Sequence, residues 1–144
     1  MLAILQRLFA RRACRGAQPR QDSEGLRSED PAERRRVVRQ LRQPDPLLYL
    51  ARHDSEPVVR DAAVDRLRTL LVGGAPGLTL ADREATLTIC DDSTLIAHVA
   101  RRGREPAIRQ AAVRLVEGDR LLQEIIREDT DPDVREAARQ RLSS

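Results

Sequence analysis

One sequence pattern occurs three times in this chain and decides its fold. It stands as DTDPDVREAARQRL at residues 129–142, as DSEPVVRDAAVDRL at residues 54–67 and as GREPAIRQAAVRLV at residues 103–116. Each copy has a proline near its start, an arginine three residues later and a pair of alanines directly after that. A weaker copy begins at Pro31. Internal repeats with a period of about 20–50 residues are typical of stacked helical units.

The proline of each copy serves as an anchor, and the anchors are Pro31, Pro57, Pro106 and Pro132. Successive anchors are 26, 49 and 26 residues apart, so the middle step is close to two periods. Proline fits the first turn of a helix, and an acidic residue before it can accept a backbone N–H that has no partner in the helix. The residues before the anchors are Asp30, Glu56, Glu105 and Asp131. We therefore predict that every anchor starts a helix and that the acid before it caps that helix.

Apolar residues recur at fixed distances from the anchors. Alanine pairs follow three anchors by five and six residues, and their small side chains let neighbouring helices approach closely. A large aliphatic residue follows every anchor by ten residues: Leu41, Leu67, Val116 and Leu142. Ahead of three anchors, a second apolar set has the spacing of one helix face. Its members are Leu47, Leu50, Ala51, Ile96, Val99, Ala100, Leu122, Ile125 and Ile126.

This pattern predicts a repeating unit made of a short helix, an acidic turn and a longer helix. Such a unit cannot bury its apolar face alone and must stack on a neighbour. The composition agrees, because hydrophobic residues make up 40% of the chain while tryptophan is absent. A core poor in aromatic side chains suits packed helices better than a β-sandwich or barrel. We predict an all-α fold, a short α-solenoid of about four helix-pair repeats.

Two regions and one interruption are expected along the chain. Residues 1–29 are predicted to be a basic N-terminal segment, partly helical or flexible, and residues 30–144 to be the repeat domain. A glycine- and proline-rich break near residues 73–78 is predicted to be a hinge or an exposed loop. After it, Thr79 and Asp82 have the spacing of a capping box, which predicts a helix at about residues 80–90. Cys90 on that helix is interpreted as a small buried hydrophobe rather than a reactive thiol.

The first and last copies carry charged residues where the inner copies are apolar. Glu33 and Arg36 stand at these positions in the first copy, and Arg139 in the last. Terminal repeats need polar outer faces, so we interpret these residues as caps. An edge that docks a partner would show the same substitutions.

The stretch LLYLARHDSEPVVRDAAVDRL at residues 47–67 resembles the HEAT-like helical repeats, in the short form that also occurs in phycobilisome-lyase-type proteins. Residues 95–142, which begin LIAHVARRGREP, resemble more closely the helical N-terminal region of bacterial proteins with the domain of unknown function number 349. The resemblance covers about residues 30–144 and implies a HEAT-like or armadillo-like superhelix. The larger C-terminal helical domain of that family has no counterpart in this sequence, so we expect little of its function to carry over.

The sequence contains no pattern that predicts catalysis or cofactor binding. His53 and His98 take different places in the repeat, and neither is followed by the glutamate of the paired motifs with which some HEAT-like hydroxylases bind iron. Cys14 and Cys90 have neither zinc-site spacing nor a disulfide framework around them. VGGAP lacks the lysine and the spacing of a phosphate-binding loop. We predict a non-enzymatic protein without catalytic residues, metal, cofactor or small-molecule substrate.

Positive charge is concentrated at the N-terminus. Residues 1–20 hold five of the 26 arginines and no acid, which leaves 21 arginines against 23 acids in the rest of the chain. All basic residues are arginine, which fits either a GC-rich genome or phosphate recognition. MLAILQRLFARR could form a helix at a membrane surface or a helix docked on the first repeat. Its apolar run is too short for a signal or a spanning segment, so we expect a cytoplasmic protein.

An arginine follows every anchor by three residues: Arg34, Arg60, Arg109 and Arg135. These four residues are called the repeat arginines below. They could form a ladder that binds an acidic partner, or they could bridge to turn acids such as Asp54 and Asp129. We favour the second possibility, which makes the repeat arginines structural.

The exposed side of the longer helices is the best candidate for partner binding. Positions four, eight and eleven residues after each anchor form a stripe, called the helix stripe below. Its residues are Arg35, Arg39, Arg42, Asp61, Asp65, Arg68, Gln110, Arg114, Glu117, Glu136 and Gln140. The charge of the stripe changes from basic to mixed along the chain. A merely solvated helix face would look the same.

Two functions are therefore compatible with the sequence. The first is a scaffold or adaptor that binds a protein or peptide partner on the helix stripe. The second is binding to nucleic acid or to an anionic membrane surface through the arginine-rich N-terminus and the helix that contains Arg34 and Arg42. Scarce aromatic residues argue against single-stranded nucleic acid.

Overall fold

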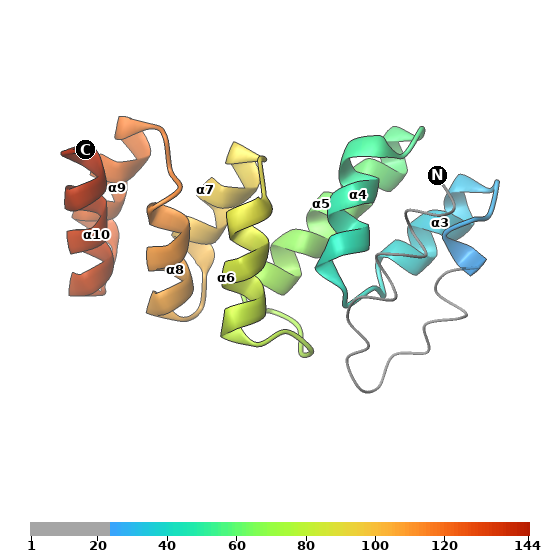
Figure 1. The fold of residues 1–144 in the computed structure, drawn as a ribbon, viewed down its shortest axis with the longest axis horizontal. Coiled ribbons are helices and arrows are strands. Elements are labelled where there is room, and N and C mark those ends of the chain that lie inside the picture. Colours follow the sequence, from blue (N-terminus) through green and yellow to red (C-terminus); the bar gives the residue numbers. More distant parts are fainter. Residues whose placement is uncertain (1–23) are drawn as a thin grey trace. The chain divides into compact units, whose positions relative to one another are not determined.

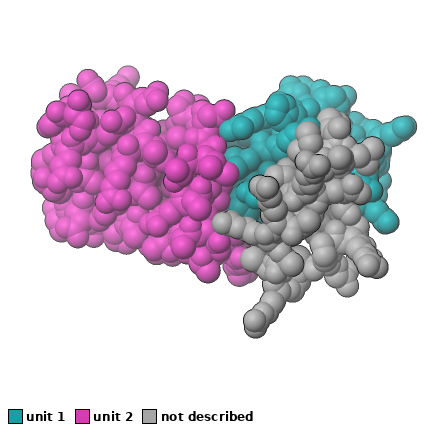
Figure 2. Space-filling model, in the orientation of Figure 1, with its two compact units in different colours: residues 1–67 teal, residues 68–144 magenta. Residues whose placement is uncertain are grey.

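The computed structural model describes residues 24–144, and this part of the chain is helical, without a β-strand. The predicted all-α fold class is confirmed at this level. Contacts between residues divide the chain into two compact units, residues 1–67 and residues 68–144, which Figure 2 shows in different colours. The helix considered for MLAILQRLFARR and most of the predicted N-terminal segment lie outside the described residues.

The four anchor prolines are the first residues of four helices, as predicted. These helices are α3 (Pro31–Val38), α5 (Pro57–Leu71), α8 (Pro106–Val113) and α10 (Pro132–Leu142). The helices predicted ahead of three anchors are also present, as α4 (Pro44–His53), α7 (Ser93–Arg102) and α9 (Asp119–Glu128). The boundary between the two compact units falls within α5.

Within residues 68–144, the anchored helices form a row. Helix α8 contacts α10 on one side and α6 (Leu80–Ile89) on the other. Helix α7 packs on α8, and α9 packs on α10 (Figure 1). Each of these pairs is therefore a helix, a turn and an anchored helix, which is the predicted repeating unit.

The predicted capping acids behave in two ways. The Asp30 carboxylate accepts the backbone N–H of Ala32, and Asp131 accepts those of Asp133 and Val134. The prediction is wrong for Glu105, whose side chain makes no capping hydrogen bond. Its carboxylate instead accepts two hydrogen bonds from Arg83, because the longer glutamate side chain reaches away from its own helix.

The predicted apolar faces form the core. Ala63, Ala112 and Ala138 are completely buried, as expected for residues at close helix contacts. At the position ten residues after the anchor, Leu41, Leu67 and Val116 are buried as well. Leu142 differs because it is 36% exposed. No helix among the described residues packs beyond α10 to cover it.

The chain contains the same three-helix arrangement twice, at a distance of 75 residues. Adding 75 to both ends of α3 gives the ends of α8, and adding 75 to both ends of α4 gives the ends of α9. The same shift takes Pro57, which starts α5, to Pro132, which starts α10. The α3–α4–α5 segment and the α8–α9–α10 segment therefore have the same element lengths and connections.

The interruption between the two arrangements lies where the sequence predicts it. The predicted helix is α6, and Thr79 and Asp82 form its capping box. No helix pair spans residues 73–78, where Gly73 and Gly77 have positive φ angles of 87° and 119° that favour glycine. The backbone N–H of Arg104 donates to the Val72 carbonyl oxygen at 3.0 Å, which holds the start of this connection. Cys90 is buried but lies one residue beyond α6 instead of on it.

The burial of Ala112 predicts the result of an overpacking substitution. Ala112→Leu should lower the free energy of unfolding by about 1–3 kcal/mol, because a closely packed helix contact has no room for the added side chain. Ala85→Leu is the matched control, since Ala85 is exposed in the middle of α6. Chemical denaturation followed by circular dichroism measures both variants. Equal stability of the two variants would show that the buried face of α8 is assigned incorrectly.

Candidate functional site

Arg34 in α3 joins its helix to the turn that precedes α5. Its Nε and Nη2 donate to the two carboxylate oxygens of Asp54, each at 3.0 Å. The side chains are only 11% and 5% exposed. Nη1 of Arg34 donates to the carbonyl oxygens of Ser28 and Glu29, in the turn before its own helix. One guanidinium therefore connects two successive turns.

Arg109 in α8 makes the same contacts 75 residues later. Its Nε and Nη2 donate to the Asp129 carboxylate at 2.9 and 3.0 Å. Nη1 donates to the carbonyl oxygen of Gly103 at 2.9 Å, and that of Arg104 accepts at 3.3 Å. The side chains of Arg109 and Asp129 are 12% and 8% exposed. Both turn acids singled out in the sequence thus receive an arginine from the preceding anchored helix.

The two aspartates are held from a second side by the backbone. Asp54 accepts the N–H of Glu56 at 3.0 Å, and Asp129 accepts the N–H of Asp131 at 2.9 Å. Bidentate pairs of this kind are geometrically specific and stronger than neutral hydrogen bonds. We call this unit, an arginine with its own-turn carbonyl and the aspartate of the next turn, the turn bridge.

Arg60 and Arg135 form only half of a turn bridge. Nη1 of Arg60 donates to the Asp54 carbonyl oxygen, and Nη1 of Arg135 donates to the Asp129 carbonyl oxygen at 2.8 Å. Among the described residues, neither arginine has a carboxylate partner for Nε and Nη2. Both guanidinium groups are half-buried and anchored at one edge.

Arg83 in α6 is a fifth arginine of this type, and the sequence analysis did not identify it. It lies three residues after Leu80, the first residue of α6, just as Arg34 lies three residues after Pro31. Its Nη1 and Nη2 donate to the Glu105 carboxylate, both at 2.7 Å. The capping box at Thr79 already fixed the start of α6, so the signal was present in the sequence.

A second repeated contact was also missed. Nε of Arg66 in α5 donates to the Leu41 carbonyl oxygen at 2.7 Å. Nε of Arg141 in α10 donates to the Val116 carbonyl oxygen at 3.0 Å. Both arginines follow their anchor by nine residues, so their equal spacing is visible in the sequence. Each connects an anchored helix to the end of the preceding anchored helix.

The bridges shift the pKa values of their members. Hydrogen bonding to Asp54 raises the pKa of Arg34, although burial opposes this. Burial tends to raise the pKa of Asp129, but hydrogen bonds from Arg109 and from the Asp131 backbone outweigh it, so the pKa is lowered. The hydrogen bonds from Arg83 lower the pKa of Glu105 to about 2. The acids therefore stay ionised at neutral pH, in the form that the arginines bind.

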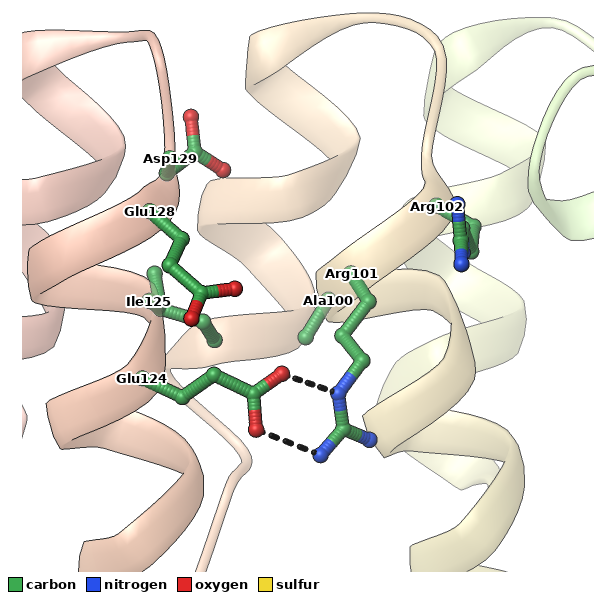
Figure 3. A pocket seen from close by; sticks show the side chains of 7 residues that line it. All are labelled: Ala100, Arg101, Arg102, Glu124, Ile125, Glu128 and Asp129. Carbon is green, nitrogen blue, oxygen red and sulfur yellow. Dashed lines mark hydrogen bonds and ion pairs between the residues drawn. The ribbon is translucent and has the colours of Figure 1, made fainter.

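A polar hollow of about 220 Å³ lies between α7 and α9. Figure 3 shows Arg101 and Glu124 pointing toward each other across it, and two hydrogen bonds of 2.6 and 3.0 Å join them. Hydrogen bonding to Arg101 lowers the pKa of Glu124. Its lining residues are Ala100, Arg101, Arg102, Glu124, Ile125, Glu128 and Asp129. The hollow thus opens beside a turn bridge and is itself crossed by an ion pair.

The helix stripe is mostly exposed. In unit 1, Arg35, Arg39 and Arg42 from α3 and its following turn are exposed, as are Asp61 and Asp65 of α5. Arg114, Glu117, Glu136 and Gln140 are exposed in unit 2, whereas Arg68 and Gln110 are only half-exposed. Arg68 lies close enough to Asp92 and His98 for its charge to lower the pKa of both.

The charged residues interpreted as caps are exposed. Glu33 and Arg36 lie on the exposed side of α3, and Arg139 is exposed on α10, where it pairs with Glu136 at 3.2 Å. Exposure is required both of a cap and of a docking edge, so both interpretations stay predictions.

Residues 24–144 contain no group of three or more His, Cys, Asp or Glu side chains that is placed to hold a metal ion. His53 stacks against Tyr49 with ring centroids 4.8 Å apart. Burial lowers the pKa of His98, and the neighbouring arginines lower it further. None of the helices in the described part of the chain has the length and apolar character needed to cross a bilayer.

Comparison of the chain with protein-family models, with curated proteins and with solved structures found no match. The function must therefore be inferred from the residues of this chain.

Removal of Arg109 is predicted to destabilise the fold strongly. Arg109→Gln leaves the Asp129 carboxylate buried without its cation, which should cost about 3 kcal/mol of unfolding free energy. Arg114→Gln removes an exposed arginine from the end of the same helix and should change stability by less than about 0.5 kcal/mol. Urea denaturation of the two variants measures this difference. Similar midpoints for both variants would contradict the structural role of the turn bridge.

The Arg83–Glu105 pair predicts a pH dependence of stability. The pKa of Glu105 is about 2 in the folded chain against an ordinary value of 4.5. The pair therefore contributes its full stability above pH 4.5 and loses it as the pH falls toward about 2. Wild type should be more stable than Glu105→Gln at neutral pH, and this advantage should shrink over that range. A constant difference in melting temperature down to pH 2 would exclude this effect.

Proposed function

We propose that this chain is a non-enzymatic scaffold for protein–protein interaction, in which the helix pairs stack as a short α-solenoid of the HEAT-like or armadillo-like type. The row α6, α8 and α10, with α7 and α9 packed on it, supports this arrangement within residues 68–144. The turn bridges support it as well, because the same contacts recur after 75 residues. About four helix-pair repeats would make up the row.

The observation that carries the proposal is the difference between framework and surface in the two 75-residue copies. Framework residues are the same in both: Arg34 corresponds to Arg109, Asp54 to Asp129 and Arg66 to Arg141. Residues of the helix stripe change instead. Arg35 corresponds to Gln110, Arg42 to Glu117 and Asp65 to Gln140.

A constant framework with varied exposed residues is the way in which repeat proteins present a binding surface. The partner would be a protein or peptide segment that contacts the helix stripe, without a cofactor or a chemical reaction. We propose a cytoplasmic setting for this interaction.

A second candidate function is binding to nucleic acid or to an anionic membrane surface. It is favoured by the exposed arginines Arg35, Arg36, Arg39 and Arg42 in and directly after α3. The five arginines of residues 1–20 would add to this charge. The two functions differ in their dependence on salt, because phosphate binding weakens by roughly 0.9 log units per log unit of salt for each phosphate contacted.

Charge reversal on the helix stripe tests the proposal. A partner is first identified by affinity purification and mass spectrometry, and its binding to purified protein is then titrated. Asp61→Arg combined with Asp65→Arg should abolish this binding, because both residues are exposed on the stripe. Deletion of residues 1–20 and moderate salt should leave it intact.

The matched control places new arginines on a different helix, as Gln123→Arg combined with Glu128→Arg in α9. Both of these residues are exposed, so the fold should tolerate the change. Circular dichroism verifies that each double variant is folded. The scaffold proposal fails if the Asp61 and Asp65 variant still binds its protein partner. Salt-sensitive binding of RNA or anionic vesicles that disappears on deletion of residues 1–20 would support the second function instead.

A further inference from the structure

We propose that the outer face of α10 is a second docking surface, where Arg135 binds the carboxylate of an acidic turn in a partner protein. This inference is independent of binding on the helix stripe. It starts from the unequal use of the repeat arginines. Arg34 and Arg109 each hold an aspartate with Nε and Nη2, whereas these two atoms of Arg135 have no acceptor among the described residues.

Arg135 is already in position to bind such a carboxylate. Its Nη1 donates to the Asp129 carbonyl oxygen at 2.8 Å, and the same atom of Arg109 donates to the Gly103 carbonyl oxygen at 2.9 Å. Both arginines also stand at the same place in their helices, three residues after the first proline. A guanidinium held at one edge loses less conformational freedom on binding, which favours association.

The chain itself shows which ligand fits this edge of the guanidinium. Asp54 and Asp129 both lie three residues before the proline that starts a helix, and both accept two hydrogen bonds from an arginine. Each aspartate also accepts a backbone N–H two residues further on, so it belongs to a tight turn. The ligand expected for Arg135 is therefore an aspartate in a turn before a helix.

The surroundings of Arg135 fit a protein partner. Leu142 is 36% exposed on the same helix, while its counterparts Leu67 and Val116 are covered. A docked helical unit would cover Leu142 and bring its acidic turn to Arg135. Arg139 is exposed one turn after Arg135, so the face offers positive charge to an acidic segment.

A second copy of this chain is a poorer occupant. The turn before α3 would have to supply the carboxylate, and Ser28 stands there at the position that corresponds to Asp54 and Asp129. A serine hydroxyl cannot accept both guanidinium hydrogen bonds in the bidentate way that a carboxylate does. We therefore assign the surface to a different protein with an acidic turn.

The test uses a synthetic peptide with the sequence of residues 119–136, which carries the helix, the turn and the aspartate of one bridge. The full chain is labelled with nitrogen-15, and the Nε–Hε signal of Arg135 and the amide signal of Leu142 are followed during titration. Both signals should shift in a saturable way. A peptide with Asp129→Asn should bind about tenfold more weakly, because it lacks the charged acceptor.

Two variants of the chain separate this site from general attraction of charges. Arg135→Gln should remove the shift of the Leu142 amide, whereas Arg139→Gln, on the same exposed face, should retain most of it. Circular dichroism establishes that both variants are folded. The proposal is overturned if the two peptides bind equally, if Leu142 still responds in Arg135→Gln, or if the first peptide causes no saturable shift.

Discussion

A buried arginine that holds an aspartate of the next turn is the interaction on which the described structure depends. Arg34 with Asp54 and Arg109 with Asp129 are almost completely enclosed, so each charge is tolerated only because the other is present. The planar guanidinium can bind one turn with two nitrogens and its own turn with the third, which a lysine ammonium cannot do. This geometry fixes how far one anchored helix lies from the next turn. Apolar residues such as Ala63 and Ala112 then fill the space between the helices.

Much of the fold could be predicted from the sequence because helix starts follow local rules. Proline in the first turn marked four helices, and a capping box marked α6. The partners of individual side chains were harder to predict. Glu105 has the sequence position of a cap, yet it pairs with Arg83, and only the packing of α6 on α8 brings these residues together. The burial of Arg68 depends on neighbours in space, so its place on the helix stripe gave no sign of it.

Gly103 explains why one bridge differs from the others. It stands three residues before Pro106, where the corresponding positions hold Asp54 and Asp129. A Cβ atom at Gly103 would lie 2.6 Å from Cγ2 of Ile108, so a side chain there would collide with the core. Glu105, two residues later, supplies the carboxylate from outside this crowded position. Its side chain is 48% exposed, which makes this ion pair the more open one.

The bridges join residues that are close in the sequence. Arg34 and Asp54 are 20 residues apart, and Arg66 and Leu41 are 25 residues apart. Closing such short loops costs little chain entropy, and proteins dominated by local contacts fold quickly. Each helix, turn and helix can therefore form before distant parts of the chain meet. A chain built in this way can fold segment by segment while it emerges from the ribosome, without waiting for its C-terminus.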